Sequence, residues 1–314
     1  DHEDAANFQN AFSSTLLEAD FKYAHVDFGT TAIWPKRFEL GYLFPLMDRV
    51  FYQNNIGDYD NISLFGNIKL QKPGLGKMWF SLFLDEFNGF SSSTGLLSFN
   101  FFETTRDMFA IQAGTKVVVP WLPFATVSCR YTKIQPYCYT HQAVNYTPWY
   151  TYYISEAYQN NGECLGYYLP PNSDELNLNF EMMPKNNLTA HFQYQFMRHG
   201  CDFGTQAVDG SSLYSELTPD DDDRENKRSY FLHDGAYQWF HVVNIGASYT
   251  FKNLKQPLMV YANAGYVFTY FTVIDDDSDA NDNESHPYHY SGDDNGVYSS
   301  EQGVVLSCGF RFSL

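Results

Sequence analysis

The stretch Gly303-Val-Val-Leu-Ser-Cys-Gly-Phe-Arg-Phe-Ser-Leu314 alternates between apolar and polar residues almost without a break. Successive side chains of a β-strand point to opposite faces, so this pattern predicts a strand with one apolar and one polar face. The apolar face would hold Val304, Leu306, Cys308, Phe310, Phe312 and Leu314. On the polar side, only Val305 breaks the pattern. Closing strands of outer-membrane β-barrels read this way, with the apolar face toward lipid and the polar face toward the lumen.

The same alternation recurs along the chain and predicts eleven strands, almost without helical periodicity. The expected strands span residues 15–29, 37–46, 59–71, 76–87, 107–119, 123–140, 174–183, 187–199, 236–251, 256–274 and 303–314. Most of them reach the roughly 9–11 residues that a tilted strand needs to cross a bilayer.

The predicted connections alternate strictly between short and long. Short links fall at residues 72–76, 120–123, 184–187 and 252–255, and long polar stretches at 88–106, 141–173, 201–235 and 275–302. Outer-membrane barrels pair tight periplasmic turns with long external loops, whereas a soluble sandwich has no reason to keep this parity. If Leu314 ends on the periplasmic side, every long loop lies outside the cell.

The predicted fold is therefore all-β: a single domain over residues 1–314, forming an antiparallel transmembrane β-barrel in a bacterial outer membrane, in contact with its lipid and lipopolysaccharide. Eleven is an odd number, whereas single-chain bacterial barrels have an even number of strands. We therefore expect the first N-terminal strands of the barrel to be missing from this chain.

Composition agrees with this fold and excludes other classes. The mean hydropathy of -0.39 excludes a helical membrane protein, because no apolar run is long enough to span as a helix. The 25 tyrosines and 28 phenylalanines fit the aromatic girdles that barrels place at both membrane interfaces. A net charge of -18 argues against nucleic acid as a partner, because phosphate binding needs clustered lysine and arginine.

Catalytic and metal-binding motifs are absent from the sequence, so we predict no enzymatic activity, cofactor or metal. No serine lies in a nucleophile motif, and adjacent Asp85 and Glu86 would point to opposite faces of a strand. The five cysteines contain no C-x-x-C pair, although one disulfide among Cys138, Cys164 and Cys201 is open. The acidic runs at 220–223 and 275–294 are expected to be solvated loops rather than calcium sites.

Two groups of short motifs resemble the Wzi-type capsule-assembly family. The first is Tyr52-Gln-Asn-Asn-Ile-Gly-Asp-Tyr-Asp-Asn61, followed by Leu64-Phe-Gly66 and Phe80-Ser-Leu-Phe-Leu-Asp-Glu-Phe87. The second is Tyr158-Gln-Asn-Asn-Gly-Glu-Cys-Leu-Gly166, followed by Pro171-Asn-Ser-Asp-Glu-Leu176 and Tyr194-Gln-Phe-Met-Arg-His-Gly200. The resemblance runs loosely from Phe21 to Leu314. It implies an outer-membrane barrel that acts as a surface lectin and holds capsular or exopolysaccharide.

The resemblance also shows departures. The family is longer at its N-terminus, Leu314 stands where many barrels end in phenylalanine, and the long acidic loops have no counterpart in it.

Sugar recognition needs flat apolar rings beside fixed polar groups. The loop at 141–173 offers such a set: Tyr146, Trp149, Tyr150, Tyr152, Tyr153, Asn160 and Asn161. These aromatics are about equally well explained as an interface girdle with loop packing. A second set lies near predicted external strand ends: Asp60, Asn61, Asp85, Glu86, Asp174 and Glu175. These residues would either bind glycan hydroxyls or, as we favour, tie loops together across the barrel mouth.

Two other functions stay open for such a barrel. A passive porin would have an open polar lumen, while the bulky Phe65, Trp79 and Phe83 on the inward face favour partial plugging. A purely structural or adhesive surface protein is the second alternative.

Overall fold

The computed structural model describes residues 10–34, 40–43, 60–86, 108–141, 144–145, 153–154, 156–160, 163–201, 235–254, 256–274 and 296–312. Within these residues the chain is all-β and is dominated by one antiparallel sheet of eleven strands. Its strands, in sheet order, are β1 (Ala11–Asp20), β2 (Ala24–Trp34), β3 (Asn61–Lys72), β4 (Gly76–Glu86), β5 (Met108–Val119), β6 (Ala125–Ile134), β11 (Ser173–Lys185), β12 (Leu188–Cys201), β13 (Gly235–Phe251), β14 (Leu258–Ile274) and β15 (Gly296–Phe312).

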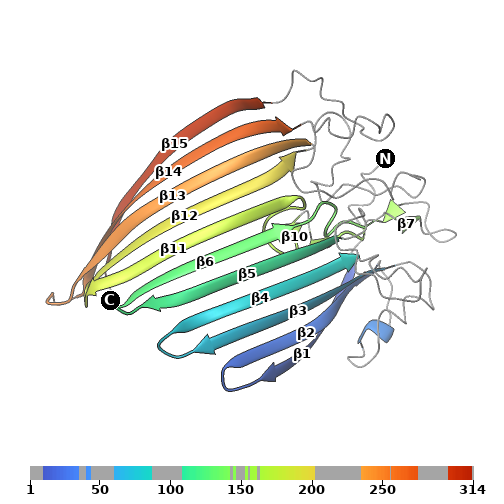
Figure 1. Cartoon of the computed structure of the whole chain (residues 1–314), viewed down its shortest axis with the longest axis horizontal. Coiled ribbons are helices and arrows are strands. Elements are labelled where there is room, and N and C mark those ends of the chain that lie inside the picture. Colours follow the sequence, from blue (N-terminus) through green and yellow to red (C-terminus); the bar gives the residue numbers. More distant parts are fainter. Residues whose placement is uncertain are drawn as a thin grey trace.

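The sheet is a meander in which each strand pairs with the sheet strand that follows it in the chain. All short links lie at one end, and the strands on either side of each long connection meet at the other end, as Figure 1 shows. The short links are residues 21–23, 73–75, 120–124, 186–187 and 252–257. The predicted alternation of short and long connections is thus confirmed. We call the two ends of the sheet the short-link end and the long-connection end.

Two predicted strands at 123–140 and 303–314 have other bounds in the structure, since β6 ends at Ile134 and β15 begins at Gly296. Two further predictions fail outright, and these two errors compensate in the strand count. Residues 15–29 were expected to form one strand, but the chain turns at residues 21–23 and separates β1 from β2. Residues 37–46 were expected to form a strand, but their described part contains the 3₁₀ turn η2 (Gly41–Leu43). No described helix is long and apolar enough to cross a membrane.

Strand register divides the side chains between two faces, because residues paired directly across antiparallel strands point the same way. One row across six neighbouring strands consists of Asp27, Asn67, Ser81, Gln112, Thr132 and Glu175, and we call its side the polar face. A row on the opposite side, the apolar face, contains Val127, Phe180, Phe192, Ile245, Ala264 and Leu306. The alternation predicted for 303–314 is confirmed for its described part, and Leu306 is 76% exposed.

Aromatic residues border the apolar face near both ends of the sheet. Toward the long-connection end, rings on β12, β13 and β14 contact one another: Tyr194, Phe196, Trp239, His241, Phe268 and Tyr270. Toward the short-link end, exposed rings lie in the links and at strand ends: Phe21, Tyr23, Trp121, Phe124, Phe251 and Phe312. Exposed aliphatic residues such as Ile68 and Ile245 lie between these two borders.

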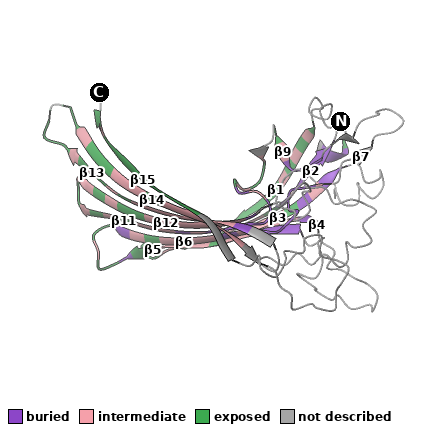
Figure 2. Cartoon of the chain, turned by 90° about the horizontal axis from the view of Figure 1, so that it is seen from above, coloured by how far each residue is buried: buried purple, intermediate pink, exposed green. Residues whose placement is uncertain are grey.

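The sheet is curved, and the chain between β6 and β11 returns onto its concave side, where β9 (Gln159–Asn160) is seen in Figure 2. This part also contains β7 (Val144–Asn145), β8 (Tyr153–Ile154) and β10 (Glu163–Cys164), in two short hairpins. We call the described parts of residues 135–172 the inner segment.

The inner segment builds the larger hydrophobic core against the polar face. Its buried residues are Tyr137, Cys138, Tyr139, Tyr158 and Leu169, packed against Ile33, Ala110 and Ile134 of the sheet. A smaller cluster on the apolar face joins Trp34 to Tyr42 of η2. Part of the predicted external loop 141–173 thus lies on the concave polar face.

Candidate functional site

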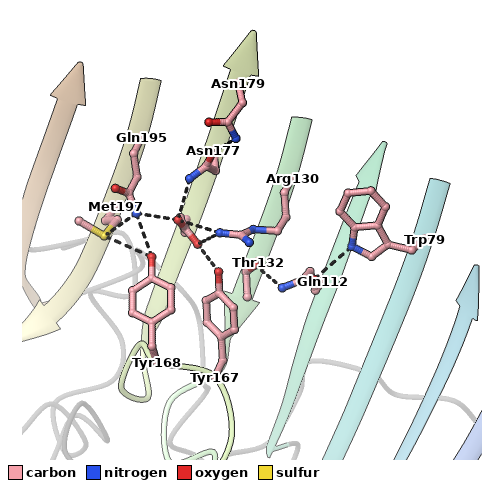
Figure 3. Close-up of polar contacts among 11 residues, drawn as sticks. Trp79, Gln112, Arg130, Thr132, Tyr167, Tyr168, Asn177, Asn179, Gln195 and Met197 are labelled. Atoms are coloured by element: carbon pink, nitrogen blue, oxygen red, sulfur yellow. Dashed lines mark hydrogen bonds and ion pairs between the residues drawn. The ribbon is translucent and has the colours of Figure 1, made fainter. Parts of the chain in front are cut away.

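Glu175, near the start of β11, is the centre of a polar cluster on the concave face (Figure 3). Its carboxylate is completely buried and accepts hydrogen bonds from Arg130 Nη2 on the neighbouring strand, at 3.2 Å to both oxygens. It also accepts from Gln195 Nε2 on the other side at 2.7 Å, and from Asn177 Nδ2 at 3.4 Å. A buried carboxylate needs such donors, because the loss of its hydration is otherwise very costly.

Two tyrosines of the inner segment complete the cluster. Tyr167 donates its hydroxyl proton to Glu175, and its ring lies 5.6 Å from the Arg130 guanidinium. The neighbouring Tyr168 accepts a hydrogen bond from Gln195 Nε2 at 2.9 Å while 58% of the residue stays exposed. The inner segment is therefore fixed to three adjacent strands, β6, β11 and β12, and presents one aromatic ring to the concave side.

The polar row continues from this cluster toward β4. Gln112 donates to Thr132 Oγ1 at 3.1 Å and accepts from the Trp79 indole Nε1, also at 3.1 Å. The Trp79 ring lies over Gly114, where a Cβ atom would overlap it. Glycine on β5 thus lets a large ring lie against the sheet, and Trp79 lies on the concave polar face.

Two further contacts hold the inner segment at the long-connection end. Asp85 accepts from Ser63 Oγ at 2.8 Å and from the backbone N–H of Tyr139 at 2.6 Å. Asn61 Nδ2 donates to the backbone carbonyl of Glu156 at 3.2 Å. Asp60 is also buried here. The sequence left two roles open for these residues, glycan binding and contacts between loops. In the structure Asn61, Asp85 and Glu175 each hydrogen-bond to the inner segment.

Asp174 belongs to a different environment, because it points to the apolar face. It accepts from Arg198 Nε and from the Tyr131 hydroxyl, both at 2.9 Å. The Arg198 guanidinium lies 5.1 Å from the Trp239 ring and 5.9 Å from the Phe196 ring. Adjacent Asp174 and Glu175 thus serve two clusters on opposite sides of one sheet.

Burial changes the acidity of the inner segment. It raises the pKa of Tyr167 to about 12, and the hydrogen bond to Glu175 acts in the same direction. Burial also raises the pKa of Cys138, and that of Cys164 to about 11. Both cysteines are free thiols, while the side chain of Cys201 lies outside the described part of the chain. The raised pKa values keep these groups in their neutral, hydrogen-bonding forms at neutral pH.

Several predicted glycan-binding residues cannot be placed. Tyr146, Trp149, Tyr150, Tyr152 and Asn161 lie outside the described residues, as do the acidic runs at 220–223 and 275–294. For Tyr153 and Glu86 the structure gives only the backbone, in β8 and β4. Asn160 is exposed in β9 and pairs with Glu163. In the described part of the chain no group of three or more histidine, cysteine and acidic side chains is arranged to hold a metal.

Sequence reasoning missed Tyr167, Tyr168 and Gln195 as members of the site. The sequence contains an indication of their role, because Cys164-Leu-Gly-Tyr-Tyr-Leu169 is an apolar and aromatic run inside a long polar connection. Such a run indicates a buried anchor. Comparisons with protein-family models, with curated proteins and with solved structures found no match for this chain.

Proposed function

We propose that this chain forms the wall of an outer-membrane β-barrel that retains capsular or other surface polysaccharide noncovalently, as its resemblance to Wzi-type proteins implies. The membrane part of the proposal is supported by the exposed apolar face, which extends over the sheet from Leu17 on β1 to Leu306 on β15. Continuous apolar surface on this scale marks contact with lipid or protein rather than water.

Strand length and aromatic placement support the same proposal. The strands of the sheet have 10 to 17 residues, and about 9–11 suffice to cross the hydrocarbon core. Aromatic borders on either side of an aliphatic band match the two girdles of a membrane barrel. The Arg198–Asp174 pair then lies in the border nearer the long connections, where aromatic rings flank it.

The direction of the edge strands supports closure by further strands. β1 and β15 are the two edges of the described sheet, and both run from the long-connection end to the short-link end. Pairing them directly would give a parallel seam. An odd number of strands between them would make every pair antiparallel and give the even total typical of bacterial barrels. Closure also removes unpaired edges, which are not tolerated in lipid.

The observation that carries the retention role is the fixed position of the inner segment on the concave face. A wide porin needs an open lumen, whereas Tyr167 and Asp85 take part in contacts that hold the inner segment on the concave face, where it would narrow a closed barrel. The exposed ring of Tyr168 beside the Gln195 amide offers the stacking surface and polar group that sugars need.

The test is binding of the full-length barrel, folded in detergent, to the surface polysaccharide of its own cell. A Trp149→Ala, Tyr152→Ala double variant and a Tyr168→Ala variant are measured beside it. We expect saturable binding by the wild type and weaker binding by at least one of the variants. A folded wild type that does not bind would overturn the retention role. A wide, steady single-channel conductance in that case would establish the porin instead.

A further inference from the structure

Formal charge is unequally distributed over the polar face. The half formed by β1 to β6 and β11 carries charged side chains that include Asp27, Lys69, Lys116, Arg130 and Glu181. On β12, β13 and β14 the polar face has no aspartate, glutamate, lysine or arginine within the described strands.

In place of charges, these strands and the neighbouring β15 present amides and hydroxyls in register, while the charged Glu301 and Arg311 on the same face of β15 lie outside the rows described next. One row consists of His191, Gly246, Asn263 and Ser307, and the next of Gln193, Asn244, Gly265 and Val305. A third row, nearer the short-link end, consists of Thr189, Ser248, Tyr261 and Gly309. We call these three rows the uncharged lane.

Side chains in the lane lie flat against the sheet. A Cβ atom at Gly246 would overlap both the Asn263 amide and the His191 ring. Glycine at this position therefore allows both side chains to pack against the backbone of the sheet. Asn263 Nδ2 donates to Ser307 Oγ at 3.2 Å. A hollow in the surface is lined by the row His191, Gly246, Asn263 and Ser307. The residues directly before and after Gly246, Asn263 and Ser307 in the chain complete its lining.

We infer that the uncharged lane is a binding track for neutral, hydroxyl-rich glycan. This inference rests on the proposed function and names its substrate class. Amides and hydroxyls both donate and accept hydrogen bonds, as sugar hydroxyls do. Tyr261, which is 36% exposed, adds a ring against which a sugar face can pack. On β12 to β14 the polar face has no cation that could replace the lost hydration of an anionic glycan, and Arg311 of β15 lies beyond the three rows at the short-link end.

The experiment measures calorimetric binding of neutral glucan oligosaccharides and of anionic oligogalacturonates to the folded full chain. The lane variants are Asn263→Leu and Ser248→Leu, and Ser128→Leu on the polar face of β6 is the matched control. Loss of one hydrogen-bonding group should weaken neutral-glycan binding by about fivefold to tenfold. The control should bind like the wild type.

An Asn263→Lys variant provides a second readout. It should lose affinity for the neutral glycan and gain affinity for the anionic one. If the wild type binds its cell's own polysaccharide but prefers oligogalacturonate, or if Ser128→Leu weakens binding as much as the lane variants do, the lane is not the track. That result would leave the retention role standing. Absence of binding to the cell's polysaccharide would overturn the proposed function itself.

Discussion

At the residue scale, Glu175 is the acceptor on which the inner segment depends. Glu175→Gln keeps the size of the side chain but replaces one acceptor oxygen by an amide donor. Tyr167, Arg130 and Gln195 would then compete for the single remaining acceptor oxygen. Loss of charged hydrogen bonds at a buried site should lower the free energy of unfolding by about 1.5–3 kcal/mol. Urea unfolding in lipid vesicles measures this difference.

Glu181 is the matched control for that substitution, since it lies on the same strand and the same face. Its contact with Lys116, at 3.2 Å, joins side chains that are 61% and 40% exposed. Exposed ion pairs contribute about 0–1 kcal/mol, so Glu181→Gln should change stability little. Equal effects of the two substitutions would mean that Glu175 does not anchor the segment.

Tyr167 should make stability depend on pH in the alkaline range. Its pKa is raised from the ordinary value of 10 to about 12, first by burial and then by the bond to Glu175. The neutral hydroxyl is therefore favoured in the folded state, and its contribution is fully present below pH 10 and is lost as pH rises through about 12. The stability difference between wild type and Tyr167→Phe should shrink over that range, as followed by denaturant midpoints. A constant difference up to pH 12 would contradict this assignment.

At the element scale, alternation predicted most strands because the apolar face is continuous across the sheet. It failed at residues 15–29, where alternating residues continue through the turn Phe21-Lys22-Tyr23 without glycine, proline or asparagine to mark it. An exposed aromatic turn is unusual in water but suits a membrane interface. The prediction at 37–46 failed because Tyr42 is buried against Trp34 on the sheet rather than hydrogen-bonded in a ladder.

The site was only partly predictable, for a physical reason. Strand periodicity placed Trp79 and Phe83 on the polar face, since that depends on local sequence alone. The path of the inner segment depends on contacts between residues far apart in the chain, such as Tyr139 with Asp85. Periodicity carries no information on such pairings.

The apolar face of β13 gives a direct test of membrane contact. Ile245 is 52% exposed in the middle of the strand. If the sheet spans a membrane as proposed, an arginine there would face the bilayer midplane and should cost about 2–4 kcal/mol in urea unfolding from vesicles. Asn244→Arg, one residue away on the polar face, should cost much less. Similar costs at both positions would argue against a lipid-facing side.

At the scale of the whole molecule, the sheet has two zones with different surroundings. Toward the short-link end one face is exposed and apolar, whereas toward the long-connection end the inner segment covers part of the polar face and η2 covers the apolar face at β1 to β3. A membrane wall would require the first zone. The second zone, at the long-connection end, resembles the core of a water-exposed domain. In a membrane barrel such a core would have to lie outside the bilayer.

If the sheet closes into a barrel as proposed, this division predicts how ions would pass through it. If the inner segment narrows the lumen, the wild type should show low conductance in planar lipid bilayers. Joint substitution of its two anchors, Asp85→Asn and Glu175→Gln, should loosen the segment and raise the conductance and its fluctuations. Glu181→Gln removes one charge from the same face without touching an anchor, so it separates an electrostatic effect from an opening. An equal rise in the double variant and in Glu181→Gln would show that charge, rather than the position of the segment, limits the current.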